Sequence, residues 1–146
     1  MAGALSMADI PPGTVLEIVA AIVTDPAGRA LLVRKRGTEA FLQPGGKIEP
    51  GEDPLDALVR ELEEELGLVA ARERFRFVGA FTAPAANEAG VTVDACVWAL
   101  ETDEKLGPRA EIEELLWIAD LEDAAGRVIA PLSVEHLLPL WHSSRA

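Results

Sequence analysis

An acidic helix that follows a glycine-rich turn constrains this chain more than any other segment. The turn reads Gly46-Lys-Ile-Glu-Pro-Gly-Glu52 and leads into residues 54–66. Asp53 is a favourable N-cap residue, and the proline at position 54 is well tolerated in a first helical turn. Gly67 is typical of the position just beyond a helix end. The sequence therefore predicts a helix over 54–66 with defined ends.

The two faces of this predicted helix differ in chemistry. Apolar residues recur at intervals of three and four positions, at Leu55, Leu58, Val59, Leu62 and Leu66. At about 100° per residue, Glu61, Glu64 and Glu65 fall on a separate arc. Like charges at this spacing destabilise a helix. Together with Glu52, these acids favour a divalent-metal site and chemistry on phosphates; the alternative is an ordinary solvated acidic face.

The same segment resembles the Nudix box, G-x5-E-x7-R-E-U-x-E-E-x-G-U, in which U is aliphatic. Every position of the pattern is met, by Gly46, Glu52, Arg60, Glu61, Leu62, Glu64, Glu65, Gly67 and Leu68. The preceding Pro44-Gly-Gly-Lys-Ile-Glu49 is similar to the entry loop of MutT-like members. Residues 111–117 resemble the acidic segment with a tryptophan that follows the box in many of them. These motifs are specific for the family and not for a substrate.

The resemblance implies a fold and a reaction. The fold would be an α/β/α sandwich with a mixed sheet between helices. The reaction would be metal-dependent hydrolysis of a diphosphate linkage in a nucleoside diphosphate derivative. The MutT-like entry loop favours a nucleoside triphosphate, cleaved to monophosphate and pyrophosphate, with nucleotide-pool sanitisation as one role. The alternatives are an ADP-ribose or nucleotide-sugar pyrophosphatase and a regulatory module that binds nucleotides without turnover. The intact acids weigh against the module.

The resemblance also assigns metal ligands. Glu61 and Glu65 would be the central ligands, and Glu64 would complete the set. The backbone carbonyl of Gly45 would add another ligand. Oxygen ligands of this kind suit Mg²⁺ or Mn²⁺.

Further roles in the reaction are expected of charged residues near the box. Glu52 would orient Arg60 through an ion pair or assist at the metal. The general base would be Glu61 itself or an acid outside the box, for which the candidates are Glu111, Glu113 and Glu114. A base must lie within hydrogen-bond reach of the proton that it accepts. Ordinary loop charge is the alternative reading of each acid outside the box.

Substrate contacts are expected outside the acidic helix. One of the consecutive residues Arg34, Lys35 and Arg36 is expected to bind phosphate, with Arg34 and Arg36 preferred, and Lys47 is a further candidate. A base needs an apolar or aromatic platform with a few placed polar groups. The candidates for this platform are Phe41, Phe81, Asn87 and Trp98.

The rest of the chain predicts an α/β fold with a mixed sheet. Strands are predicted over 14–24, 30–36, 41–43, 74–82, 91–100 and 115–118, and a turn at 25–29 joins the first two in a hairpin. A C-terminal helix is predicted over 133–142, with Ser133 as N-cap and Pro139 as an internal weakness. Cys96 is expected to be a small core residue.

Length, charge and cysteine content bound the remaining properties. The 146 residues fit one domain, placed at 13–146 after a flexible extension over 1–12. The formal net charge of −12 disfavours nucleic-acid polymers but not a nucleotide that meets bound metal. No apolar run is long enough to span a membrane, and the single Cys96 favours a reducing cytoplasm. The expected partner is a small nucleotide, and a homodimer stays open.

Overall fold

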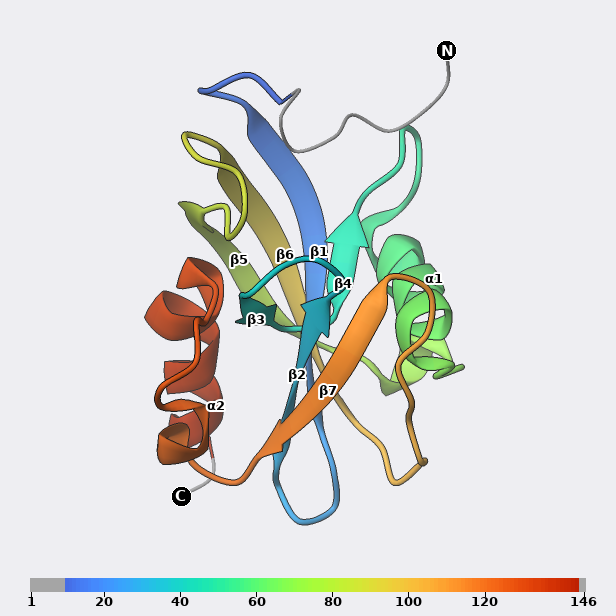
Figure 1. Cartoon of the computed structure of the whole chain (residues 1–146). Helices are drawn as coiled ribbons and strands as arrows, with labels where there is room; N and C mark the ends of the chain where they lie inside the picture. Colours follow the sequence, from blue (N-terminus) through green and yellow to red (C-terminus); the bar gives the residue numbers. More distant parts are fainter. Residues whose placement is uncertain (1–9, 145–146) are drawn as a thin grey trace.

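The computed structural model describes residues 10–144, which are built around one mixed sheet (Figure 1). The strand order is β3-β2-β1-β6-β5, and in addition β4 pairs with β1 and β7 pairs with β2. The bounds are β1 Val15–Thr24, β2 Ala30–Lys35, β3 Phe41–Leu42, β4 Gly45–Lys47, β5 Arg76–Pro84, β6 Thr92–Glu101 and β7 Ile112–Ile118. Strands β1 and β6 pair in parallel, whereas the β1–β2, β5–β6 and β2–β7 pairs are antiparallel.

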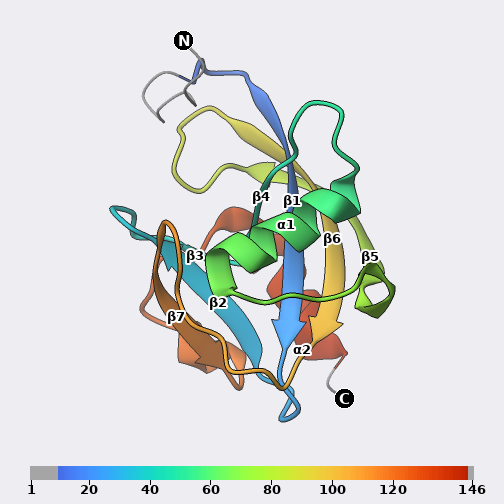
Figure 2. The same ribbon diagram turned by 90° about the vertical axis from the view of Figure 1, so that its right-hand side faces the viewer.

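Helices cover both faces of this sheet (Figure 1, Figure 2). Helix α1, Pro54–Leu66, packs on one face, and the C-terminal helical segment, which ends in α2 at Leu138–Ser143, packs on the other. Strand β1 separates two cores because successive side chains of a strand point to opposite faces. Within 19–23, the odd-numbered residues join the core under α1 and the even-numbered residues join the core under α2. The predicted α/β/α sandwich is confirmed.

Most predicted strands agree with the structure to within two residues at each end, and two elements differ. Residues 45–47 were expected to form a loop, but they form β4 and pair with β1, with Gly45 opposite Ala20. Strand β7 begins at Ile112 rather than at residue 115, because its acidic side chains find partners across the strand, such as Arg34 opposite Glu114. Pairing with β1 thus holds the glycine-rich turn against the centre of the sheet.

The C-terminal helix begins before the residue predicted to cap it. Helical backbone starts at Pro131, and Ser133 lies inside the helix with 0% exposure. The Leu138 N–H donates to the Ser133 carbonyl five residues back, which makes Ser133–Leu137 a π-helical turn. Pro139 lies two residues after the end of this wider turn, and its ring cannot pack against a regular preceding turn. The N-cap prediction for Ser133 is therefore wrong, because its hydroxyl makes a tertiary contact instead.

The predicted extension over 1–12 lies mostly outside the described residues, which begin at Ile10. Ile10 is 8% exposed, and the Gly13 N–H donates to the Gly90 carbonyl at 2.8 Å. Residues 10–12 thus adjoin the folded part of the chain. Across residues 10–144, no helix combines the length and apolar character needed to cross a membrane.

Candidate active site

Helix α1 is positioned by both of its predicted caps. The Asp53 carboxylate accepts hydrogen bonds from the N–H groups of Leu55 and Asp56 at 3.1 and 3.2 Å. At the other end, Gly67 adopts a φ of 71°, which is left-handed backbone that favours glycine. The residues that α1 buries are Ala57, Leu58, Leu62, Glu65 and Leu66. One acid of the box is therefore buried together with the apolar face.

Glu65 is a buried carboxyl group with little compensation. It is 2% exposed, and its Oε1 accepts a hydrogen bond from the Gly45 N–H at 3.2 Å. Burial, followed by the nearby charge of Glu61, raises the pKa of Glu65 to about 8. A carboxylate removed from water is costly unless it is paired or binds a metal ion. The position of Glu65 therefore requires either a proton or a cation near neutral pH.

Glu61 lies directly against the glycine-rich turn. A Cβ atom on Gly46 would collide with the Glu61 carboxylate, so glycine leaves the room that this side chain occupies. The Glu61 side chain is only 15% exposed, and its Oε2 accepts a hydrogen bond from Arg60 Nη1 at 3.1 Å. Burial raises the pKa of Glu61, although the Arg60 charge opposes this effect. Glu65 and Glu61 thus meet the consecutive glycines 45 and 46.

Arg60 joins the turn to the helix. Its Nε and Nη2 donate to the two carboxylate oxygens of Glu52, each at 2.9 Å, and Nη2 also donates to the Lys47 carbonyl at 3.3 Å. The hydrogen bond from Arg60 lowers the pKa of Glu52 to about 2. Bidentate pairing adds directionality that an ordinary exposed ion pair lacks. Of the two roles predicted for Glu52, this geometry supports the orientation of Arg60.

The box acids fit a divalent cation in part. Among residues 10–144, no three His, Cys, Asp or Glu side chains gather into a complete metal-binding group. The charge of Glu61 adds to the effect of burial in raising the pKa of Glu65, whereas Glu64 is half exposed and lies 3.4 Å from Arg60 Nη1. Mg²⁺ commonly takes one or two carboxylates and completes its shell with water and phosphate oxygens. Glu61 and Glu65 therefore fit such an ion, and Glu64 would have to leave Arg60 to join them.

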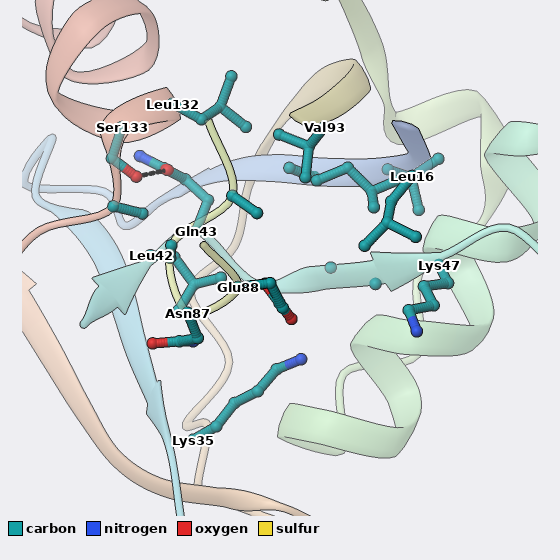
Figure 3. A pocket seen from close by; sticks show the side chains of 18 residues that line it. Leu16, Lys35, Leu42, Gln43, Lys47, Asn87, Glu88, Val93, Leu132 and Ser133 are labelled. Carbon is teal, nitrogen blue, oxygen red and sulfur yellow. Dashed lines mark hydrogen bonds between the residues drawn. The ribbon is translucent and has the colours of Figure 1, made fainter. Parts of the chain in front are cut away.

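A cavity of about 130 Å³ borders the glycine-rich turn (Figure 3). Gly45 and Gly46 line it, so the backbone that meets Glu65 and Glu61 also borders the cavity. Aliphatic side chains form much of the remaining wall, including Leu16, Ile18, Ala20, Val93 and Leu132. The polar side chains that line it are Lys35, Gln43, Lys47, Asn87, Glu88 and Ser133. Two predicted substrate residues, Lys47 and Asn87, are therefore at the cavity.

The aromatic residues predicted to form a base platform lie elsewhere. Phe41 is 6% exposed and belongs to the core. Phe81 packs against His136 with a centroid distance of 5.2 Å and borders a separate hollow. Trp98 makes an edge-to-face contact with Phe77. Aliphatic side chains thus form much of the wall of the cavity beside the box, and Phe41 and Phe81, the predicted aromatic contacts, do not line it.

Arg34 and Arg36, the preferred phosphate ligands of the sequence analysis, are both engaged with strand β7. Arg34 Nε donates to Glu114 Oε1 at 2.7 Å, and Arg36 Nε lies 3.4 Å from Glu113 Oε1. Neither arginine lines the cavity, whereas Lys35 does. Of these three consecutive basic residues, Lys35 is therefore the one that lines the cavity.

Strand alternation carried a signal for Lys35 that the sequence analysis missed. Leu31 and Val33 join the core under α1, and residue 35 follows at the same period of two. The Lys35 charge correspondingly lowers the pKa of both Glu61 and Glu65, against the larger effect of burial. Lys35 thus shares the side of the sheet on which the box acids lie.

A family model described as the NUDIX domain matches residues 16–135, from the start of β1 into the C-terminal helix. The chain belongs to the Nudix family. Its Nudix domain superposes on the solution structure of the E. coli ORF135 protein with a TM-score of 0.69 at 29% identity, covering 91% of this chain and 92% of that one. The fold predicted from the Nudix box is therefore the observed fold.

Curated relatives match the Nudix domain over shorter stretches. An 8-oxo-dGTP diphosphatase of Haemophilus influenzae is 39% identical over 71 residues, which cover 43% of this chain and 52% of that protein. An RNA pyrophosphohydrolase of Halorhodospira halophila is 48% identical over 50 residues, which cover 34% of this chain and 28% of that protein. The matches thus span about half, or less, of the length of these relatives.

In this Nudix domain, the three acids considered as general base occupy different surroundings. Glu113 and Glu114 pair with the arginines of β2. Glu111 Oε1 instead lies 3.6 Å from Lys35 Nζ, and its charge contributes to the raised pKa of Glu65. Of these three acids, Glu111 is therefore the one whose charge acts on a carboxyl group of the box.

Arg109 contacts the end of α1, which the sequence alone did not indicate. The backbone N–H of Arg109 donates to the Glu65 carbonyl at 2.9 Å. Its guanidinium covers Gly67 so closely that a Cβ atom on this glycine would lie 2.5 Å from Arg109 Cζ. A cation at this end of α1 interacts favourably with the helix dipole. No local pattern indicates the contact, because Arg109 reaches α1 from the loop that follows β6.

Proposed function

We propose that this chain is a divalent-metal-dependent pyrophosphohydrolase that cleaves a nucleoside triphosphate to a nucleoside monophosphate and pyrophosphate. The observation that carries this proposal is the position of Glu61 and Glu65 against the two glycines that also line the cavity. A solvated acidic face would leave both carboxyls in water, whereas Glu65 is 2% exposed. Buried oxygen ligands beside a cavity suit a cation that shares its shell with phosphate.

The metal would be Mg²⁺ or Mn²⁺, held by Glu61 and Glu65, with Glu64 and the Gly45 carbonyl completing the ligands. When bound, such an ion neutralises phosphate charge and lowers the pKa of a coordinated water. Arg60 acts as a positioning residue, since its hydrogen bonds reach the turn and Glu61. Hydrogen-bond partners of metal ligands commonly set ligand orientation in this way.

Two lysines bind the substrate phosphates from the cavity side. Lys35 and Lys47 both line the cavity, and ammonium groups are common phosphate ligands. Glu111, 3.6 Å from Lys35 Nζ, accepts the proton of the attacking water. This assignment is preferred over Glu113 and Glu114, which are paired with arginines away from the cavity.

A free nucleotide is the preferred substrate over RNA or ADP-ribose. One curated relative is named for 8-oxo-dGTP and another for RNA. The net charge of −12 disfavours a nucleic-acid backbone, whereas Lys35 and Lys47 supply positive charge locally. Removal of damaged nucleotides from the pool would be one use of this activity. A reducing cytoplasm suits both the substrate and the single, unpaired Cys96.

The test is a substrate panel with product identification. The protein is incubated with Mg²⁺ and each natural deoxynucleoside triphosphate, 8-oxo-dGTP, a 5′-triphosphorylated RNA, ADP-ribose or a nucleotide sugar. A triphosphate should yield pyrophosphate and monophosphate, and Glu65→Gln should lower turnover by at least about 100-fold. The control is Glu63→Gln, an exposed residue of the same helix. Release of inorganic phosphate alone, or full turnover by Glu65→Gln, would contradict the proposal.

A further inference from the structure

The cavity beside the Nudix box contains a buried pair of polar side chains that the proposed reaction does not use. Gln43 lies between β3 and β4, and Ser133 lies in the C-terminal helix; they are 5% and 0% exposed. The Ser133 hydroxyl donates to Gln43 Oε1, as Figure 3 shows. Both residues line the cavity, together with lysines 35 and 47. The cavity thus has a buried polar pair in addition to its cations.

The hydrogen bond from Ser133 fixes the orientation of the Gln43 amide. With Oε1 receiving the hydroxyl proton, the Nε2 group is left as the free part of the amide. Among the described residues, Gln43 Nε2 has no hydrogen-bond partner. Every side-chain nitrogen or oxygen of these residues that is fully shielded from solvent does have a partner. The Nε2 group is therefore accessible, and the cavity that Gln43 lines provides the space for that access. A ligand in the cavity would meet a hydrogen-bond donor there.

The surroundings make this donor selective. Much of the wall of this cavity is aliphatic, with Leu16, Val93 and Leu132 among the lining residues. A donor in such surroundings loses free energy unless a ligand supplies an acceptor. A carbonyl oxygen on a nucleobase satisfies it, whereas an exocyclic amino group would place two donors against each other. Sites built around a hydrogen bond reject analogues that cannot form it.

We infer that Gln43 determines base specificity by donating from Nε2 to a carbonyl of the nucleobase, and that Ser133 is the positioning residue that holds the amide in this orientation. The inference rests on the proposed function and adds the substrate class to it. Keto bases, which are guanine, 8-oxoguanine, uracil and thymine, are favoured over bases with an amino group at the matching position, which are adenine and cytosine.

The experiment compares matched pairs of substrates. The ratio of kcat/KM is measured for dGTP over dATP and for dUTP over dCTP, with Mg²⁺ and the full chain. We expect the wild-type protein to prefer the keto base in each pair by about tenfold or more. Gln43→Met keeps a side chain of similar length without the donor and should bring both ratios toward one. Gln43→Glu replaces the donor by an acceptor and should favour the amino base.

Ser133→Ala tests the positioning role separately. Without the hydroxyl, the Gln43 amide is free to turn either way, so the keto preference should fall several-fold while kcat for the better substrate changes less. The matched control is Ser144→Ala, whose hydroxyl donates to the Trp141 carbonyl in the same helical segment. Binding of dGMP and dAMP to metal-free protein, measured by calorimetry, should follow the same order. This readout is independent of turnover.

The outcomes separate this inference from the proposed function. If the wild-type protein releases pyrophosphate from no nucleotide, the proposed function fails. If it is active but treats the members of each pair alike, or if folded Gln43→Met keeps the wild-type ratio, the inference is overturned and the proposed function stands. Circular dichroism and thermal unfolding establish that each variant is folded. Gln43→Met serves as the decisive variant if Gln43→Glu does not fold.

Discussion

Arg60 and Glu52 form a bidentate ion pair, in which Nε and Nη2 of the arginine each lie 2.9 Å from a different oxygen of the carboxylate. Glu52 ends the glycine-rich turn and Arg60 lies in the second turn of α1, so this pair closes the turn over the helix. The remaining nitrogen, Nη1, reaches Glu61 at 3.1 Å. Glu52, eight positions before Arg60, thus orients the arginine that donates to the candidate metal ligand Glu61.

Arg60→Lys should lower kcat while leaving most of the stability intact. Lysine keeps the positive charge, but it cannot make the parallel hydrogen bonds of the guanidinium. The expected loss is about 10–100-fold in kcat or in Mg²⁺ affinity, as for other groups that hold metal ligands. The measurement is a Mg²⁺ titration of pyrophosphate release.

Arg72→Lys is the matched control for this substitution. Arg72 forms ion pairs with Asp53 and Asp56, near the start of the same helix, and all three side chains are about half exposed. Its replacement should leave kcat unchanged. Equal losses in the two variants would mean that Arg60 has no special role in positioning.

Metal-free protein should lose stability as the pH rises through the range in which Glu65 ionises. The pKa of Glu65 is raised from 4.5 to about 8 in the folded state by burial and by Glu61. Because this pKa is raised in the folded state, the contribution of Glu65 to the free energy of unfolding is complete below about pH 4.5. It is lost as the pH rises through about 8. At about 1.4 kcal/mol per pKa unit, the loss is a few kcal/mol and at most about 5 kcal/mol.

The check is thermal unfolding in the presence of a chelator at about pH 5 and about pH 9. Glu65→Gln removes the titrating group and should be the more stable protein at the higher pH. Addition of Mg²⁺ should restore the wild-type protein there and have less effect on the variant. An unchanged pH profile in Glu65→Gln would show that another group controls the loss.

Gly46→Ala should impair Mg²⁺-dependent activity through a single methyl group. The added Cβ would occupy the space of the Glu61 carboxylate, which would have to move away from the turn. We expect a loss in activity on the order of 100-fold, with a smaller change in melting temperature, since the displaced group is a side-chain end. Activity is measured over a range of Mg²⁺ concentrations.

Gly107→Ala provides the comparison, because a Cβ at that glycine would have nothing within 4 Å. Its activity should equal that of the wild-type protein. A Gly46→Ala variant with the same activity as Gly107→Ala would show that the contact between Gly46 and Glu61 is not needed for the reaction.

Lys35→Met should weaken triphosphate binding, whereas Arg36→Met should not. Lys35 lines the cavity and acts on the pKa of Glu61, while Arg36 lies 3.4 Å from Glu113 on the neighbouring strand. A hydrogen bond between charged groups is worth about 1.5–3 kcal/mol, so KM should rise about 10–100-fold for Lys35→Met. Steady-state kinetics on both variants decide between the cations, and the reverse order would reassign the phosphate contact to Arg36.

Much of the fold and the composition of the box could be predicted because the relevant interactions are local. Asp53 and Gly67 cap α1 from adjacent positions, and the apolar period of the helix fixes which face meets the sheet. The same locality failed at Ser133. Its residue type suits an N-cap, but the helix begins at Pro131 and the serine hydroxyl bonds to Gln43 instead.

By itself the sequence determined the Nudix box, the helix that carries it and the approximate positions of most strands along the chain, because caps, turns and periodicities act between near neighbours. Only the tertiary structure decided the surroundings of each polar group. Three such features depend on residues from separate elements. They are the burial of Glu65, the contact between Gly46 and Glu61, and the hydrogen bond between Gln43 and Ser133. Such contacts depend on how layers pack, and packing brings together residues whose spacing in the chain carries no signal.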